Sequence, residues 1–332
     1  MSSKLRIGAI GAGGNMAGHL KSIVASQDAE VVALTDPSPA SIEKMHAGVP
    51  ETAKLPVFTD HRAMLAEVAL DGVIISSPHT LHLQQIMDSL DKSLHVLCEK
   101  PLVCTVADTH KVIEKANTKK RTVLVGYQRR FMGNYRAMRD FVRDPGFGTP
   151  LFVQAYQSQY WYKLFLNAWR TNPALSGGGQ INDSGSHLVD MLFWMMPSRP
   201  VEVCAMMNNR GTRVDVDSAI SFRFANGCLG NLSIHGSGPK PGMVEDITIT
   251  GDNNRAIYLR NGKVSAQKDD QQAAEITAFA PNINKTQHWV NVILGREKNQ
   301  SPPEEFLPTI AFTEACWKSA AEGGRPVQVV YE

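Results

Sequence analysis

Short apolar runs that alternate with helix-like stretches are the feature that most constrains how the first part of the chain can fold. The runs include LRIGAIG, EVVALTD, DGVIISSP and LHVLCEK, and stretches such as TLHLQQIMDSLDK separate them. Continuous apolar strands that alternate with helices are typical of a parallel sheet covered on both faces. The sequence therefore predicts a doubly wound α/β domain over residues 1–125.

From about residue 150 the pattern changes, because strand-like runs now follow one another directly. Alternating residues on either side of Asn226-Gly227 predict a hairpin, and turns at residues 252–254 and 261–262 predict a meander. Residues 126–332 are therefore predicted to form an α+β domain on a large, mostly antiparallel open sheet. Since an exposed apolar sheet face is a liability, we expect a homodimer or homotetramer that forms through this sheet.

Charge and cysteine content limit the class of partner and the compartment. The 34 Lys plus Arg and 32 Asp plus Glu leave a net charge of +2, which favours neither nucleic acid nor an anionic membrane. The N-terminus lacks the apolar region of a signal peptide, and no run approaches the roughly 18 apolar residues of a membrane span. The five cysteines are scattered without C-x-x-C spacing. We therefore expect a cytoplasmic protein whose partners are a small molecule and further copies of itself.

The run IGAIGAGGNMAGHL joins the first predicted strand to the first helix, where a dinucleotide pyrophosphate can meet backbone N–H groups. The candidate loop residues are Gly11, Gly13, Asn15 and Met16, and Met16 replaces the third glycine of G-x-G-x-x-G. Asp36 ends the second predicted strand, where a carboxylate can accept hydrogen bonds from the ribose hydroxyls and would repel a 2′-phosphate. The pattern indicates a Rossmann domain that binds NAD in preference to NADP, although a structural glycine turn and a turn aspartate are the alternatives.

Two further stretches, ISSPHTLH and CEKPL, end predicted strands of the same sheet. Ligands bind at the carboxyl ends of the strands in an open parallel sheet. A lysine between Glu and Pro at such a position is otherwise most often a solvated loop charge. The candidates for lining one cofactor cleft are Ser77, Pro78, His79, His82, Glu99 and Lys100.

The stretch INDSGSHLVD places Asp183, His187 and Asp190 at spacings of four and three residues, which puts them on one face of a helix. Three uses of this face remain open from the residues alone: a metal site, a catalytic acid–base pair, or the polar start of an ordinary helix. The glycines at 177–179 suggest a backbone that passes close to a ligand or partner, or a flexible turn.

Taken in order, these motifs resemble the glucose–fructose oxidoreductase, inositol dehydrogenase and MocA (Gfo/Idh/MocA) family of oxidoreductases. The resemblance rests on GAGGNMAGHL, SPHTLH, EKPL, VGYQRRF and WRTNPALSGGGQINDSGSHLVDMLFW, which run along nearly the whole chain. The pairing of Glu-Lys-Pro with a downstream D-x-G-x-H-x-x-D is its most specific part. The chain departs from the usual pattern at Met16 and at His79, where the family most often has Asn.

The resemblance implies that Lys100, Asp183 and His187 converge beside the nicotinamide, and that hydride passes between NAD and a secondary alcohol or ketone of a sugar, polyol or derivative. His187 is the natural base, Lys100 would stabilise the developing alkoxide, and Asp183 would orient the substrate hydroxyl. An ammonium opposite Asp183 and His187 would repel a cation, so no metal site is expected. The candidates for contact with the substrate are Tyr127, Trp169, Arg170, Asp183 and His187. Trp169 and Arg170 would line the wall of the pocket and Tyr127 its floor, and simple packing is the alternative for these three.

Two other functions compete with this dehydrogenase. One is a redox-neutral NAD-dependent glycosidase, a class that the family also resembles. The other is a non-catalytic, nucleotide-sensing protein on a Rossmann scaffold, since a fold does not determine its function. Intact Lys100, Asp183 and His187 count against the sensor, and net release of NADH would distinguish a dehydrogenase from the glycosidase.

Overall fold

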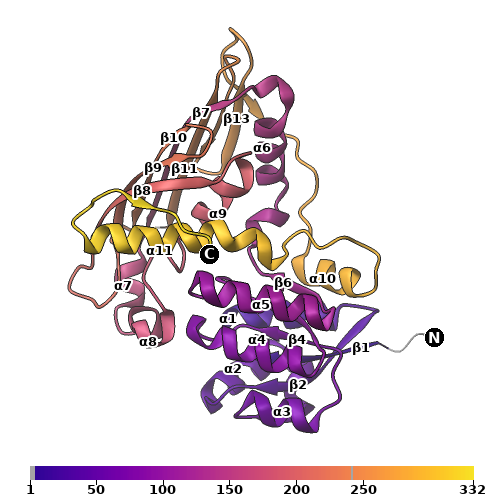
Figure 1. The fold of residues 1–332 in the computed structure, drawn as a ribbon. Coiled ribbons are helices and arrows are strands. Elements are labelled where there is room, and N and C mark those ends of the chain that lie inside the picture. The colour runs from indigo at the N-terminus through magenta and orange to yellow at the C-terminus, as the bar shows by residue number, and fades with distance from the viewer. Residues whose placement is uncertain (1–3, 241) are drawn as a thin grey trace. The chain divides into compact units, whose positions relative to one another are not determined.

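The computed structural model describes residues 4–240 and 242–332 and divides the chain into two compact units (Figure 1). The first unit contains Met1–Val103, Ala107–Gln128 and Ile283–Glu304, and the second contains Cys104–Val106, Arg129–Asn282 and Glu305–Glu332. Residues 283–304, which we expected in the second domain, thus lie with the first unit. The reason is that they include the helix Lys285–Ile293, which packs on the first unit, a long-range contact that the local sequence pattern does not reveal.

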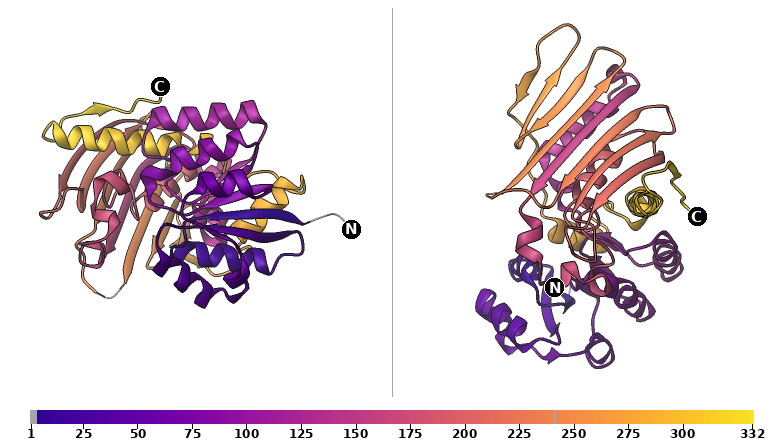
Figure 2. Two further views of the ribbon diagram at one scale, coloured as in Figure 1. Left: turned by 90° about the horizontal axis from the view of Figure 1, so that it is seen from below. Right: turned by 90° about the vertical axis from the view of Figure 1, so that its left-hand side faces the viewer.

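A six-stranded parallel sheet in the order β3-β2-β1-β4-β5-β6 forms the centre of the first unit. Its central strands are almost completely buried because their apolar runs face helices on both sides (Figure 2, left). This order is that of a Rossmann fold, which confirms the predicted doubly wound sheet. The strands are β1 (Leu5–Ile10), β2 (Ala29–Thr35), β3 (Val57–Phe58), β4 (Gly72–Ile75), β5 (His95–Cys98) and β6 (Val123–Val125).

Side-chain caps begin several helices of the first unit. The Ser38 hydroxyl accepts the N–H of Ser41, and the Asn284 side chain accepts the N–H groups of the first turn of the helix that follows it. That last helix packs against the sheet, since a Cβ on Gly72 would lie 2.9 Å from the Trp289 ring. The helices are α1 (Gly14–Val24), α2 (Pro39–Gly48), α3 (His61–Glu67), α4 (His82–Asp91), α5 (Val106–Lys119) and α10 (Lys285–Ile293), with 3₁₀ turns η1 (Pro50–Lys54) and η2 (His79–Leu81).

A nine-stranded sheet in the order β14-β13-β12-β11-β7-β10-β9-β8-β15 forms the second unit (Figure 2, right). All its pairings are antiparallel except that of β7 with β10. The predicted hairpin and meander are both present, and Gly227 turns the hairpin with a φ of +87°. The strands are β7 (Pro150–Gln159), β8 (Pro200–Asn208), β9 (Asp217–Phe224), β10 (Leu229–His235), β11 (Met243–Gly251), β12 (Ala256–Arg260), β13 (Lys263–Gln267), β14 (Ala274–Ile276) and β15 (Val327–Gln328).

Helices cover one face of this second sheet and leave the other face open. Strands β9 and β10 alternate buried and exposed residues, and the buried side includes Phe222 and Phe224, which pack edge-to-face with Phe193 and Phe312. The covering helices are α6 (Gly133–Arg143), α9 (Ser186–Met195) and α11 (Leu307–Ala321) (Figure 1). The shorter helical segments are η3 (Gln128–Phe131), η4 (Pro145–Phe147), α7 (Trp161–Phe165), η5 (Trp169–Thr171), α8 (Pro173–Ser176) and η6 (Pro303–Phe306). No helix among the described residues is both long and apolar enough to cross a membrane.

Candidate functional site

The turn between β1 and α1 has the close backbone approach that a dinucleotide-binding loop requires. Gly11 has a φ of +86°, and a Cβ at this position would lie 2.7 Å from the Ser76 carbonyl oxygen, so only glycine fits. Asn15 is exposed on the first turn of α1, whereas the Met16 side chain is fully buried in the core. The Met16 side chain therefore packs into the core, at the position where the usual motif has its third glycine. The glycine loop before it keeps the turn that fits a pyrophosphate.

Asp36 lies against this glycine loop. Its Oδ2 accepts the Ala12 N–H at 2.7 Å and its Oδ1 accepts the Ser38 N–H at 2.8 Å. Because each carboxylate oxygen has a second lone pair, these two bonds orient the group and leave acceptor capacity for ribose hydroxyls. Gly11 and Asp36 together fit the pyrophosphate and ribose of a dinucleotide.

His82 joins the stretch that follows β4 to the stretch that follows β5. The His82 ring is buried, with Nδ1 at 2.8 Å from the Pro101 carbonyl oxygen and Nε2 at 3.0 Å from the Ser77 carbonyl oxygen. Burial lowers the pKa of His82. The Ser77 hydroxyl donates to Gln85 at 2.6 Å, and His79 is buried beside the His82 ring. His82 thus connects the two sequence stretches that we predicted would line one cleft, and acts there as a scaffold.

Glu99 belongs to a buried network within the first unit. Its carboxylate accepts from His19 Nε2 at 2.9 Å and from the Lys285 ammonium, and His19 Nδ1 lies 2.7 Å from the Thr286 hydroxyl. Burial alone would raise the pKa of Glu99, but Lys285 and His19 hold it well below its usual range. Glu99 therefore ties β5 to α1 and α10, and the buried Lys100 follows it in the chain.

In the second unit, the Asp183 carboxylate is held by two donors. Its Oδ2 accepts from the Trp161 indole N–H at 2.7 Å and from Arg170 Nε at 2.9 Å. The Arg170 guanidinium stacks on the rings of Trp169 and Phe165, at 4.4 and 4.5 Å from their centres. The structure thus brings three predicted residues together, Asp183, Arg170 and Trp169. Trp161, which was not among the predicted residues, completes the group.

His187 lies in the first turn of α9, four residues after Asp183. Its backbone N–H donates to the Ser184 carbonyl at 3.3 Å, and the Ser186 hydroxyl donates to the Asp183 carbonyl at 2.7 Å. His187 is buried, with 8 % of its surface exposed. The turn therefore presents Asp183 and His187 in one short, internally bonded segment.

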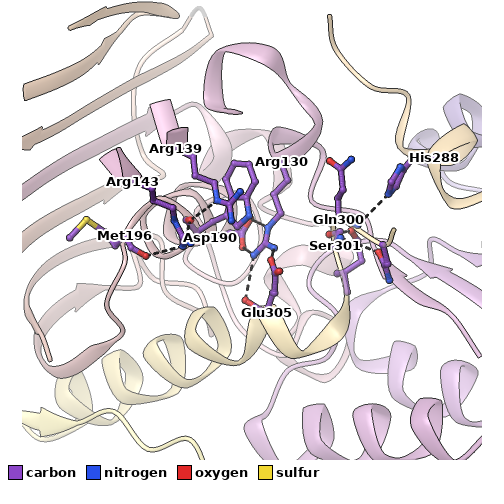
Figure 3. Close-up of polar contacts among 12 residues, drawn as sticks. Arg130, Arg139, Arg143, Asp190, Met196, His288, Gln300, Ser301 and Glu305 are labelled. Carbon is purple, nitrogen blue, oxygen red and sulfur yellow. Dashed lines mark hydrogen bonds and ion pairs between the residues drawn. The ribbon is translucent and has the colours of Figure 1, made fainter. Parts of the chain in front are cut away.

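Asp190, the last residue of the same motif, has a different role. It forms a two-pronged ion pair with Arg130, with Nε to Oδ2 at 3.0 Å and Nη2 to Oδ1 at 2.6 Å (Figure 3). Both side chains are buried, Glu305 also pairs with Arg130, and the guanidinium lies 4.1 Å from the centre of the Phe306 ring. Through Arg130, Asp190 thus links α9 to η3 and to Glu305.

The remaining site residues divide between the two units. Lys100 and Tyr127 belong to the first unit, and Tyr127 is buried just after β6. Asp183, His187 and Arg170 belong to the second unit. The convergence of Lys100 with Asp183 and His187 stays a prediction. Within residues 4–240 and 242–332, no three His, Cys, Asp or Glu side chains gather as a metal site would require, and the expected lack of a metal also stays a prediction.

Two family models match the chain, one on each side of residue 130. Residues 5–127 match the model described as an oxidoreductase family with an NAD-binding Rossmann fold, and residues 135–257 match the Gfo/Idh/MocA C-terminal domain. The two matches together cover most of the chain.

Individual relatives agree with the family match. The rhizopine catabolism protein MocA of Rhizobium meliloti is 28% identical over 199 residues, which are 60% of this chain and 59% of that protein, so the match spans less than two thirds of the relative. An inositol 2-dehydrogenase of Rubrobacter xylanophilus is 23% identical over 336 residues, covering 97% of this chain and 92% of the relative.

A solved structure shows the same fold. The WlbA dehydrogenase from Bordetella pertussis, in complex with NADH and UDP-GlcNAcA, aligns with a TM-score of 0.83 at 20% identity and covers 99% of this chain and 100% of that one. The family matches and this shared fold confirm the resemblance seen in the motifs. The chain belongs to the Gfo/Idh/MocA family of oxidoreductases, and its first unit is an NAD-binding Rossmann fold.

Proposed function

We propose that this protein is an NAD-dependent oxidoreductase that transfers hydride between nicotinamide and a secondary alcohol or ketone of a sugar, polyol or derivative. The observation that carries the proposal is the Asp183 carboxylate, fixed by Trp161 and Arg170, in the turn that also presents His187. The inositol dehydrogenase and the NADH-bound dehydrogenase among the similar proteins support the same class of reaction.

Bound NAD supplies the hydride acceptor in this proposal. His187 takes the proton of the substrate hydroxyl as the carbon is oxidised and returns it in the reverse direction. Lys100 donates a hydrogen bond to the same oxygen and stabilises negative charge there. Asp183, which Trp161 and Arg170 prevent from rotating, accepts a hydrogen bond from the substrate and orients it.

A panel of sugars and polyols, read by the absorbance of NADH, tests this proposal. Substrate-dependent accumulation of NADH is expected for at least one member. Conversion of a glycoside without net NADH would instead identify the redox-neutral glycosidase. Tight NAD binding without conversion of any panel member would favour the nucleotide sensor.

Cofactor choice gives the first prediction. Because the Asp36 carboxylate lies at the glycine loop, we expect NAD(H) to bind at least tenfold more tightly than NADP(H), a difference of about 1.4 kcal/mol. Asp36→Asn removes the charge but keeps an acceptor, so it should narrow this ratio mainly by improving NADP binding. Calorimetric titration of both proteins with both cofactors measures the ratio, and equal affinities for the unmodified protein would refute the assignment.

The open sheet face gives the second prediction. We propose a dimer, or a dimer of dimers, that forms through the exposed side of the nine-stranded sheet. Ala219 of β9 and Ser233 of β10 are exposed and lie opposite each other on this face, so Ala219→Arg should dissociate the assembly. Asn117→Arg, on the exposed side of α5, is the matched control. Light scattering that shows a stable 36.4 kDa monomer at micromolar concentration would contradict the proposal.

A further inference from the structure

A further buried aspartate, Asp215, is bonded to the loop that leads into the turn of Asp183 and His187. Asp215, two residues before β9, is 5 % exposed. Its Oδ1 accepts the Gly179 N–H at 3.0 Å and the Trp317 indole N–H at 2.8 Å, and its Oδ2 accepts the Ile181 N–H at 2.9 Å. Its backbone carbonyl accepts the Gln180 N–H at 2.8 Å. Three consecutive residues of the preceding loop are therefore bonded to this one residue.

The glycines at 177–179 allow this close approach. A Cβ on Gly179 would lie 1.9 Å from the Asp215 carbonyl oxygen, and a Cβ on Gly178 would lie 2.2 Å from the Trp317 ring. Gly177 ends α8 with a φ of +65°. The glycine run thus lets the backbone pass against Asp215 and Trp317 of its own chain, so these glycines need no ligand or partner to explain them.

The bonds continue from Asp215 into the proposed catalytic turn. The Gly179 carbonyl accepts the Asp183 N–H at 3.0 Å, and the Gln180 carbonyl accepts the Gly185 N–H at 2.8 Å. Residues 179–185 are therefore a compact turn with one end bonded to Asp215 and the other leading into α9. Any shift of residues 179–181 would move Asp183 relative to Trp161 and Arg170.

The outer side of this loop is a surface hollow of about 630 Å³. Its lining includes Gly177, Gly178, Asn208, Arg213 and Trp317. The loop therefore borders open space on that side, and its hydrogen bonds to Asp215 hold it beside the Trp317 ring. A carboxylate suits the task because both its oxygens accept, whereas an amide would turn its NH₂ group toward one or two of the three N–H donors.

We propose that Asp215 is a positioning residue, which fixes the loop of residues 179–181 and thereby sets where Asp183 and His187 meet the substrate. The inference rests on the proposed function of those two residues. Asp215 itself bonds only to backbone N–H groups and to Trp317 among the contacts described above, and its effect on the reaction passes through the turn.

Asp215→Asn is the decisive variant, and Asp217→Asn is its matched control. Asp217 lies two residues further along and also accepts a backbone N–H, that of Ser237 at 3.0 Å. Its ion pair is with Arg210, and it is not bonded to residues 179–181 in the contacts described above. For Asp215→Asn, hydrogen exchange measured by mass spectrometry should accelerate about tenfold or more in peptides covering residues 177–189, since about 1.4 kcal/mol of lost bonding corresponds to a factor of ten. Peptides from the first unit should keep their exchange rates.

Turnover distinguishes positioning from a purely structural role. Asp215→Asn should lower kcat by about 10- to 100-fold while the NAD dissociation constant and the KM change far less, because a misplaced reacting group affects the chemical step most. Trp317→Phe removes one of the three donors and should show smaller changes of the same kind, which keeps the test available if Asp215→Asn folds poorly. Asp217→Asn should leave exchange in 177–189 and kcat unchanged.

Each contrary result has a separate meaning. Unchanged exchange in residues 177–189 of Asp215→Asn would overturn the proposal, whatever the enzyme does. Faster exchange with normal kcat, in a protein that His187→Ala inactivates, would also overturn it. If His187→Ala and Asp183→Asn remained fully active, the proposed function would fail, while the exchange data would still decide whether Asp215 holds the loop.

Discussion

His187→Ala is expected to lower turnover by about 10²- to 10⁴-fold, the usual value of general acid–base catalysis, while folding and NAD affinity stay nearly unchanged. The reason is that the imidazole is the proposed acceptor of the substrate's hydroxyl proton, and its helix is held by other residues, including Asp190. Turnover, thermal midpoint and NAD affinity should be measured on the same preparations. A His187→Ala protein that is destabilised but fully active would end the catalytic assignment.

Lys100→Ala supplies the companion measurement. It should reduce turnover by a comparable factor, because Lys100 is proposed to bind the same substrate oxygen. The double variant should then lose less than the product of the two single effects, as happens when groups act as a unit. Fully multiplicative losses would indicate that the two residues act independently.

The largest expected effect on stability is that of Asp190→Ala. Removing this carboxylate leaves the buried Arg130 guanidinium with only the partly exposed Glu305 as an acidic partner, so the free energy of unfolding should fall by about 3–5 kcal/mol. Urea unfolding measures the loss. The kcat of the remaining folded protein should change much less than in His187→Ala, because Asp190 is not proposed to touch the substrate.

Two further variants show whether the loss comes from an uncompensated charge. Arg130→Met combined with Asp190→Leu removes both charges at similar volume and should be considerably more stable than Asp190→Ala. Glu275→Ala breaks the exposed pair with Lys263 in the same unit and should cost at most about 1 kcal/mol. A loss for Asp190→Ala as small as that for Glu275→Ala would show that the buried pair contributes little.

Most of the architecture could be predicted from local patterns. The buried strands of the first sheet and the hairpin at Asn226-Gly227 follow from apolar runs and turn chemistry that a few adjacent residues specify. Asp36 and Gly11 are recognisable for the same reason, since their roles depend on position just after a strand. Arg170 is one of the candidates for contact with the substrate. The structure places it against Asp183, and its contact with a substrate stays a prediction.

The supporting residues could not be predicted, because their partners are distant in sequence. Trp161 bonds to Asp183 from 22 residues away, Trp317 to Asp215 from 102, and Lys285 to Glu99 from 186. No sequence periodicity links such pairs. A single tryptophan or lysine can equally be a core residue or a surface residue, so its partner cannot be predicted from the sequence. Asp215 stands in the short pattern Asp-x-Asp at 215–217. Viewed alone, this pattern resembles the start of a strand with two solvated charges, so it does not reveal that Asp215 is a buried acceptor.

The discontinuous first unit has a consequence for how the protein is made. Strands β1 to β6 leave the ribosome early, but α10, which supplies Lys285 for Glu99 and Trp289 against Gly72, follows only after nearly all of the second unit. At about 5–20 residues per second, the nascent Rossmann sheet waits on the order of ten seconds for that helix. During this interval Glu99 lacks Lys285 and Trp289 does not yet cover Gly72, so we expect an apolar part of the nascent sheet to stay exposed until α10 is made.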